Sequence, residues 1–262
     1  MALAVETSGA KRRAKPAKAP AIDRDALLRA YRDMLLISMH MFSRDHGFYG
    51  GHGIVGAQVA LGNGLAFANW YRGQANVALT YFGEGASNQG QVYESFNLAA
   101  LLKLPCIFII ENNKYGMGTS VERASASRDL SKNGAPWGIP GEQVNGMDVL
   151  AVKEAGERAV AHCRAGKGPY LLEMKTYRYR GHSMSDPAKY RTREEVQRMR
   201  EQADPIENAR KLLLAQDVTE AALKAIDDEV KGIVQDAADF SQSSPEPSEA
   251  ELWTDVLIEE AR

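Results

Sequence analysis

Two short stretches of this chain carry groups that can bind a metal ion and a phosphate. One is Gly83-Glu84-Gly85-Ala86 and the other is Glu111-Asn112-Asn113, and each follows an apolar run. The Glu84 carboxylate, the Asn113 amide oxygen and a main-chain carbonyl, for which Tyr115 is the candidate, are hard oxygen ligands that suit Mg²⁺. Glycines let a backbone approach an anion closely, and a helix N-terminus offers free N–H groups to a diphosphate. The two stretches together indicate a site for Mg²⁺ and a diphosphate.

Bringing these stretches together requires one strand–helix–strand unit. Val77–Phe82 and Leu104–Ile110 are short apolar runs that predict buried strands. The residues from Ala86 onward predict a helix, whose apolar residues are Tyr93, Phe96, Ala99, Ala100 and Leu102. A right-handed crossover of this kind makes the two strands parallel. Their carboxyl ends then share one sheet edge, where open α/β sheets bind ligands.

A lone Gly-Glu-Gly turn more often serves packing than ligand binding, at odds of about four to one. The Asn112-Asn113 pair after the next strand, followed by Tyr-Gly-Met-Gly-Thr, reverses that preference. The sequence therefore favours a binding site over an ordinary crossover.

The rest of the chain predicts an α/β protein with a parallel sheet, helices on both faces and a helical C-terminal extension. Helices are expected over 23–37, 57–71, 149–165, 191–210 and from a cap at Thr219, and a further strand over 170–177. Irregular segments are expected as a mobile loop over 120–134, turns at 139–141 and 145–148 and a linker over 241–249. The expected divisions are a disordered basic arm (1–21), the α/β domain (22–205) and the helical extension (206–262).

Composition excludes several classes of protein. A chain of 262 residues with 44% hydrophobic and 25% charged residues is typical of a soluble globular protein, and no run approaches membrane-spanning length. The net charge of −2 argues against a dedicated nucleic-acid binder. Cys106 and Cys163 lie in apolar surroundings without a pattern, which predicts reduced core thiols. The basic arm lacks a secretory apolar segment, so a bacterial cytoplasmic location is expected, with the mitochondrial matrix as the alternative.

The paired Gly83-Glu84-Gly85 and Asn112-Asn113 resemble the thiamine-diphosphate signature. The surrounding sequence resembles the E1 α subunits of 2-oxo acid dehydrogenases, and most closely those of pyruvate dehydrogenase. The matching blocks are Ser38–Phe42, Phe48–Gln58, Gly83–Ser120 and Tyr177–Pro187. The likeness runs from Ser38 nearly to the C-terminus, and it implies the thiamine-diphosphate-binding α/β fold.

The resemblance also implies roles for individual residues. Cofactor contacts are implied for Gly53, Val55, Glu84, Gly85, Ala86, Asn113 and His182, with Gly53 and Val55 beside the aminopyrimidine. Metal ligands are implied at Glu84, Asn113 and the Tyr115 carbonyl. His182 lies in a basic and aromatic loop placed at the active-site mouth, where it can meet a diphosphate or a 2-oxo acid carboxylate. Taken alone, His182 would be read as a spare histidine in a solvated turn.

The implied activity is the decarboxylation of pyruvate, followed by transfer of the acetyl unit to the lipoyl group of E2. The implied assembly is an α₂β₂ heterotetramer in which the β chain supplies the glutamate that activates the aminopyrimidine, so this chain alone should be inactive. Ser183 matches a phosphorylation site of related mitochondrial enzymes. Branched-chain 2-oxo acid and acetoin dehydrogenase α subunits remain alternatives within the class.

The chain departs from the family pattern in two places. Several tens of residues that carry cofactor contacts are absent between Ile37 and Ser38, and Glu84 stands where the family has aspartate. The extra methylene moves the carboxylate by roughly 1.5 Å. These departures support a second hypothesis, a non-catalytic or weakly active α-like chain that binds the β subunit. An unrelated nucleotide binder is disfavoured, because neither a Walker lysine nor a Gly-x-Gly-x-x-Gly pattern is present.

Overall fold

The computed structural model of this chain describes residues 24, 25, 28 and 43–253. Residues 24, 25 and 28 are helical, in agreement with the helix expected over 23–37, whose other residues lie outside the described set. The expected basic arm over 1–21, the Ile37–Ser38 junction and residues 254–262 of the expected helical extension also lie outside the described residues.

Four parallel strands in the order β1-β2-β6-β5 form the central sheet. They are β1 (Ala78–Gly83), β2 (Cys106–Asn112), β5 (Gly141–Asn145) and β6 (Tyr170–Lys175). β1 and β2 are paired from Ala78 opposite Cys106 to Gly83 opposite Glu111. Because all neighbouring pairs are parallel, the carboxyl ends of the strands meet at one edge. The predicted strand–helix–strand unit and parallel sheet are confirmed.

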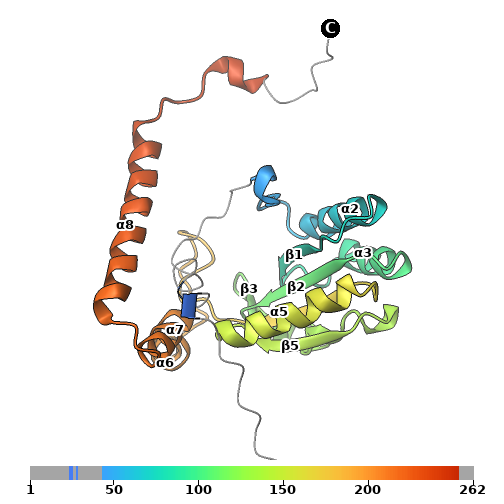
Figure 1. Cartoon of the computed structure of the whole chain (residues 1–262), viewed down its shortest axis with the longest axis horizontal. Coiled ribbons are helices and arrows are strands. Elements are labelled where there is room, and N and C mark those ends of the chain that lie inside the picture. The colour runs from blue at the N-terminus through green and yellow to red at the C-terminus, as the bar shows by residue number, and fades with distance from the viewer. Residues whose placement is uncertain (1–23, 26–27, 29–42, 254–262) are drawn as a thin grey trace, which may run out of the picture.

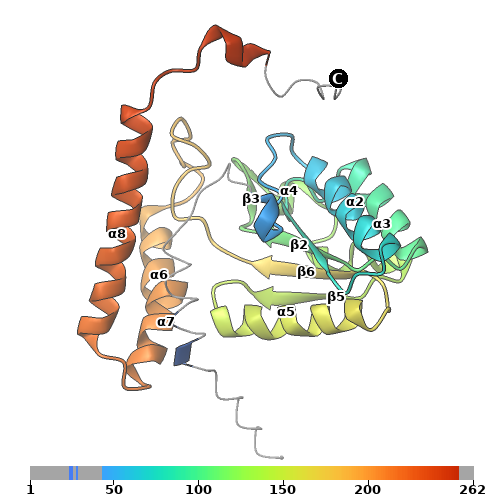
Figure 2. The ribbon, with the colours of Figure 1, turned by 45° about the horizontal axis from the view of Figure 1, so that its top comes forward.

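Helices cover both faces of the sheet, as predicted (Figures 1 and 2). On one face, α2 (Ala57–Tyr71) and α3 (Gly90–Leu101) pack on β1 and β2, with the Phe96 and Phe108 ring centroids 4.7 Å apart. On the other face, α5 (Val149–Arg164) packs on Ile107 and Ile109. The small residues of α2 have a packing reason: a Cβ on Gly62 would lie 2.5 Å from Thr80 Cβ.

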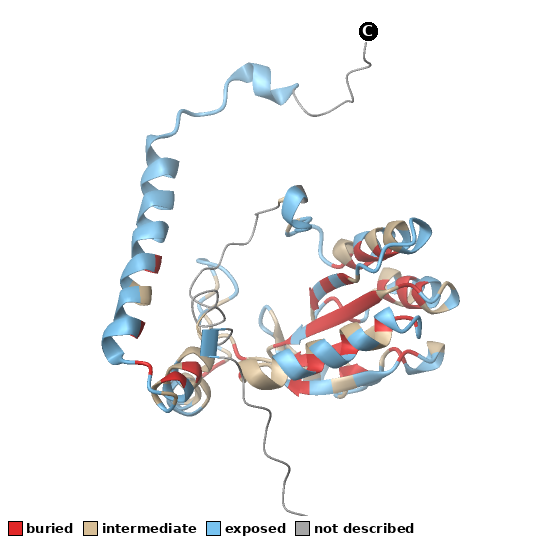
Figure 3. Cartoon of the chain, in the orientation of Figure 1, coloured by how far each residue is buried: buried red, intermediate tan, exposed pale blue. Residues whose placement is uncertain are grey.

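The C-terminal helices are α6 (Arg193–Ala203), α7 (Pro205–Leu214) and α8 (Glu220–Ser243), followed by the short helix η4 (Glu249–Leu252). α7 and the first half of α8 form a third core beside the sheet. Leu213 of α7, Val218 in the connection between the helices and Leu223 of α8 are buried together, with Val149 at the start of α5 packed against them. Thr219 caps α8 by accepting the Ala222 N–H at 3.2 Å, as predicted. Figure 3 shows that the second half of α8 is exposed all round.

Short elements connect these parts. They are η1 (Arg44–His46), β3 (Tyr115–Gly116), β4 (Thr119–Ser120), α4 (Val121–Ala124), η2 (Leu130–Lys132) and η3 (Ala135–Trp137). β3 and β4 form a small antiparallel hairpin directly after β2. Among the described residues, no helix is long and apolar enough to cross a membrane.

Several predicted boundaries were wrong. The helix expected from Ala86 begins at Gly90, because residues 84–88 form hydrogen-bonded turns and Gln89 is still extended. The helix expected over 191–210 is two helices, because Asp204 and Pro205 end α6 and start α7, with Asp204 accepting the Ile206 N–H at 2.9 Å. Proline cannot donate within a helix interior but fits its first turn.

Regular structure also occurs where the sequence predicted none. The edge strand β5 runs from the end of the first expected turn, at Gly141, to the start of the second, at Asn145, and was not predicted. The expected mobile loop over 120–134 contains α4 and η2, and Leu130 within it is fully buried. Cys106 and Cys163 are free and buried, as predicted, and burial raises the pKa of Cys163 to about 12.

Candidate functional site

Glu84 lies at the carboxyl edge of the sheet, immediately after β1. Its side chain is only 6% exposed, and its Oε2 accepts the main-chain N–H of Asn113 at 3.1 Å. The turn that carries it is closed by Ala86 N–H donating to Gly83 O at 3.0 Å and by the Ser87 hydroxyl donating to Glu84 O at 2.7 Å. The structure therefore joins the two predicted stretches through one hydrogen bond.

Two glycines bring these stretches into backbone contact. A Cβ on Gly85 would lie 3.3 Å from Gly116 Cα, and a Cβ on Gly116 would lie 3.2 Å from Gly85 Cα. Either distance is tighter than ordinary carbon contacts, so a side chain at either position would push the turn after β1 away from the β3–β4 hairpin. Glycine is therefore needed at both positions because the two backbones lie so close together, and not because of a positive φ angle.

The two asparagines after β2 have different partners. Asn112 is 2% exposed; its Nδ2 donates to Glu173 Oε1 at 2.7 Å and its Oδ1 accepts the Lys114 N–H at 2.9 Å. Lys114 has a φ of 75°, a strained value for a non-glycine residue. Asn112 therefore holds the turn, while Asn113 presents its amide on the other side.

Arg191 binds that amide, and its role was missed in the sequence. Arg191 begins the charge-dense stretch expected to be helical over 191–210, yet it is only 9% exposed. Its Nη2 donates to Asn113 Oδ1 at 3.1 Å and to Asn113 O at 3.0 Å, and its Nη1 donates to Arg178 O at 2.7 Å. The guanidinium carbon lies 4.8, 4.9 and 5.3 Å from the ring centroids of Tyr115, Tyr177 and Tyr190. Such cation–π contacts favour arginine over lysine.

Glu173, on β6, is a second buried group that the sequence did not reveal. It is 0% exposed and accepts four hydrogen bonds. The donors are Asn112 Nδ2 at 2.7 Å, Lys175 Nζ at 2.9 Å, Gln143 Nε2 at 2.9 Å and the Ser131 N–H at 3.0 Å. Burial alone would raise the pKa of Glu173, but the hydrogen bonds from Lys175, Gln143 and Asn112 outweigh it and lower the pKa. In the sequence, Glu173 is a single charged residue in a mostly apolar predicted strand, and nothing near it indicates its four hydrogen-bond donors.

The loop that carries His182 is anchored at its base by Arg178 and Arg191. His182 itself is exposed, and its main-chain N–H donates to Asp186 Oδ2 at 2.7 Å. Asp186 also accepts the Tyr190 hydroxyl at 2.7 Å and the Ala188 N–H at 2.9 Å. These hydrogen bonds lower the pKa of Asp186 to about 2, and the bond from the His182 N–H has the largest effect. Among the described contacts, none joins His182 to Glu84 or Asn113.

Gly53 and Val55 lie in an exposed loop before α2, with Val55 61% exposed. This loop reaches the start of α3, where Gln91 Nε2 donates to Val55 O at 3.3 Å. Gly56 has a φ of 86°, and a Cβ there would lie 2.1 Å from Gln89 Oε1. The loop that carries Gly53 and Val55 therefore contacts Gln89 and Gln91 at the amino end of α3, shortly after the turn that carries Glu84.

The oxygens at this edge fit a magnesium ion bound together with a phosphate. Glu84 is buried, and of its two carboxylate oxygens only Oε2 accepts a hydrogen bond among the contacts of the described residues. Asn113 Oδ1 has a second lone pair beside the bond from Arg191. Burial raises the pKa of Glu111, and the nearby charge of Glu84 raises it further. Among the described residues, no three His, Cys, Asp or Glu side chains cluster as a metal site. Mg²⁺ commonly uses few protein ligands with phosphate oxygens and water.

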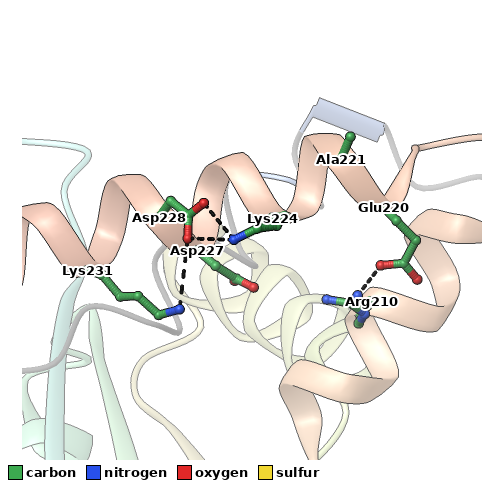
Figure 4. Close-up of a pocket in the computed structure, with 7 residues that line it drawn as sticks. All are labelled: Arg210, Glu220, Ala221, Lys224, Asp227, Asp228 and Lys231. Atoms are coloured by element: carbon green, nitrogen blue, oxygen red, sulfur yellow. Dashed lines mark hydrogen bonds and ion pairs between the residues drawn. The ribbon is translucent and has the colours of Figure 1, made fainter.

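The pocket drawn in Figure 4 lies elsewhere, between α7 and α8. Its charged residues are paired with one another: Lys224 and Lys231 with Asp228, and Arg210 with Glu220. None of the predicted cofactor residues lines it. The carboxyl edge of the sheet remains the candidate functional site.

Comparison with known proteins gives one consistent family. The family model described as "Dehydrogenase E1 component" matches residues 25–250. The pyruvate dehydrogenase E1 component subunit alpha of Rhizobium meliloti (strain 1021) is 67% identical over 222 residues, which are 84% of this chain and 64% of that protein. The protein of the same name from Rickettsia bellii (strain RML369-C) is 54% identical over 222 residues, 84% of this chain and 68% of that protein.

The mitochondrial somatic form of the same subunit from Homo sapiens is 55% identical over 217 residues, 82% of this chain and 55% of that protein. The chain thus spans less than two thirds of the length of the Rhizobium relative and little more than half that of the human one. The match nevertheless covers most of the chain. The chain belongs to the dehydrogenase E1 component family.

Proposed function

We propose that this chain is the α subunit of a pyruvate dehydrogenase E1 component that binds thiamine diphosphate and Mg²⁺ at the carboxyl edge of β1 and β2. The observation that carries the proposal is the buried Glu84 carboxylate bonded to the Asn113 N–H at 3.1 Å, with Gly85 packed on Gly116. This arrangement joins an acidic turn to an amide turn at the place where such a cofactor and its metal would sit.

Each predicted site residue has a role in this proposal. Glu84 and Asn113 hold the metal through side-chain oxygens, and the Tyr115 carbonyl is the third protein ligand. Gly85 presents its main-chain N–H to the diphosphate. Ala86, whose own N–H closes the turn on Gly83 O, lies beside the diphosphate. Gly53 and Val55 lie against the aminopyrimidine. His182, at the loop anchored by Arg191, orients the diphosphate or the substrate carboxylate.

When bound, thiamine diphosphate would supply a nucleophilic carbon for addition to a 2-oxo group, and its thiazolium ring would supply the electron sink for loss of CO₂. The residues of this chain fix the metal and the diphosphate and close the site with the 178–191 loop. The proposed partners are an E1 β subunit, in an α₂β₂ assembly, and the lipoyl group of E2. Pyruvate is the proposed substrate, and the bacterial cytoplasm is the proposed location.

A calorimetric titration tests the proposal. The chain is co-produced with a cognate β subunit, and thiamine diphosphate is added with and without Mg²⁺. Magnesium-dependent binding near one cofactor per α chain is expected. Glu84→Gln should weaken binding at least about tenfold, because it removes the anionic ligand. Glu94→Gln is the matched control, because Glu94 is exposed on α3 in the same segment.

Turnover assays then identify the substrate. Pyruvate should be preferred over 2-oxoisovalerate, and the opposite order would identify a branched-chain 2-oxo acid dehydrogenase subunit. A folded αβ assembly that binds no thiamine diphosphate would contradict the enzyme proposal. It would favour a non-catalytic or weakly active α-like chain that binds the β subunit.

A further inference from the structure

An apolar stripe runs along the whole of α8. It consists of Leu223, Ile226, Val230, Ile233, Ala237 and Phe240, and we refer to it as the α8 stripe. The spacing of three and four residues in alternation places all six side chains on one side of a helix. A helix of this kind packs its apolar side against another surface, so the environment of the stripe shows which part has a partner within the chain.

Only the first half of the α8 stripe is covered. Leu223 is 0% exposed and Val230 is 5% exposed, and Ile226 packs on the core that α7 contributes. In the second half, Ile233 is 40% exposed and Phe240 is 75% exposed. Val234, beside the stripe, is 53% exposed. Figure 3 shows this part of the helix standing apart from the sheet and the helices that cover it. The same apolar side is therefore continuous from a packed half to an unpacked half.

Charge changes along the helix at the same point. In the first half, Lys224 and Lys231 form ion pairs with Asp228 (Figure 4). After Lys231 no lysine or arginine occurs up to Trp253. The acidic residues of that segment are Asp236, Asp239, Glu246, Glu249 and Glu251. The exposed half of the α8 stripe thus lies in a purely acidic segment, which also presents Leu252 and Trp253 at 70% and 81% exposure.

We propose that residues 231–253 form a docking surface for a partner polypeptide whose groove is apolar and rimmed by lysine or arginine. Resting on the proposed function, we assign this groove to the β subunit of E1. A second copy of this chain is a poor occupant, because pairing two acidic segments would place like charges side by side. An amphipathic helix in an apolar groove is a recurring mode of association, and its anchors lie three, four and seven residues apart. Ile233, Ala237 and Phe240 have that spacing.

Binding of purified variants to the cognate β subunit tests the proposal. The first variant, Ile233→Ala with Phe240→Ala, removes two anchors without adding charge. Its matched control is Gln235→Ala with Gln242→Ala, two changes seven residues apart on the opposite side of the same helix. A third variant, Asp236→Asn with Asp239→Asn, removes two charges of the acidic segment. Circular dichroism of each chain verifies that the helix content is unchanged.

The anchor variant should bind the β subunit on the order of 100-fold more weakly, since buried aromatic and aliphatic anchors dominate interface affinity. The glutamine control should bind as the unaltered chain does. The charge variant should associate about three- to tenfold more slowly, and its rate should depend less on salt.

Three other outcomes would overturn the inference, each in a distinguishable way. An anchor variant that binds the β subunit as tightly as the unaltered chain would leave the proposed function standing without this surface. A chain that is dimeric by itself, and monomeric in the anchor variant, would show that a second copy occupies the stripe. A folded chain that binds no β subunit at all would contradict the proposed function as well.

Discussion

Arg191 Nη2 donates to the side-chain oxygen of Asn113 at 3.1 Å and to its main-chain oxygen at 3.0 Å. The two residues are far apart in the chain, and the contact joins the base of the 178–191 loop to the turn that follows β2. Any metal bound by Asn113 Oδ1 would share that oxygen with Arg191. The loop and the candidate metal site are thereby coupled through a single guanidinium group.

Replacing Arg191 should therefore loosen both parts. Arg191→Ala removes three hydrogen bonds and the contacts with three tyrosine rings, and it should lower the free energy of unfolding by about 2–4 kcal/mol. Arg191→Lys should recover little, because an ammonium cannot make the same planar contacts. Urea unfolding measures the loss, and limited proteolysis within residues 178–190 should become faster. Arg193→Ala, at an exposed position in the first turn of α6, should leave both readouts unchanged.

The close approach of Gly85 and Gly116 gives a second prediction. Gly116→Ala would place a Cβ 3.2 Å from Gly85 Cα, so the two turns must separate by a few tenths of an ångström. The hydrogen bond from Asn113 N–H to Glu84 should lengthen, and Mg²⁺-dependent cofactor affinity should fall several-fold at a stability cost of about 1 kcal/mol. Gly83→Ala is the control, because a Cβ there has no atom within 4 Å. Equal affinities of the two variants would show that the contact does not shape the site.

Glu173 predicts a dependence of stability on pH. Its pKa is lowered in the folded protein, so its ionisation stabilises the fold above its unfolded pKa of about 4.3, and this contribution is lost as pH falls through the lower folded value. Urea unfolding of the unaltered chain and of Glu173→Gln at pH 7, 5, 4 and 3 should show a difference that is largest at pH 7 and shrinks below about pH 4. A difference that stays constant with pH would show that Glu173 acts through packing alone.

The edge strand β1 predicts a solubility effect. Among the described strands β1 pairs only with β2, and its Leu79 and Tyr81 are 48% and 50% exposed. The run Val77–Gly83 contains no charge, so this edge is a template for pairing with other chains. Leu79→Lys should slow aggregation severalfold, measured by light scattering at constant protein concentration. Leu98→Lys on α3 matches it in exposure, at 45%, and should help far less, since a helix offers no open strand edge.

The sequence alone determined the local elements that build the site. α2 occupies Ala57–Tyr71 as predicted, since its small residues pack closely and Gly56 before it takes a positive φ. The apolar runs around Phe82 and Phe108 form neighbouring parallel strands. A short helical connection between two such strands favours one arrangement, a right-handed crossover that leaves the strands parallel. That connectivity alone places Glu84 and Asn113 at the same sheet edge.

Only the tertiary structure decided which polar residues are buried. Arg191 and Glu173 have the composition of surface residues, and their burial depends on partners distant in the chain, Asn113 and Asn112. Local patterns carry no information about such partners, because a charged side chain is tolerated inside a protein only when the fold supplies its hydrogen bonds. The sequence therefore determined the strands and turns that carry the candidate ligands, and packing between distant segments decided how those ligands are held.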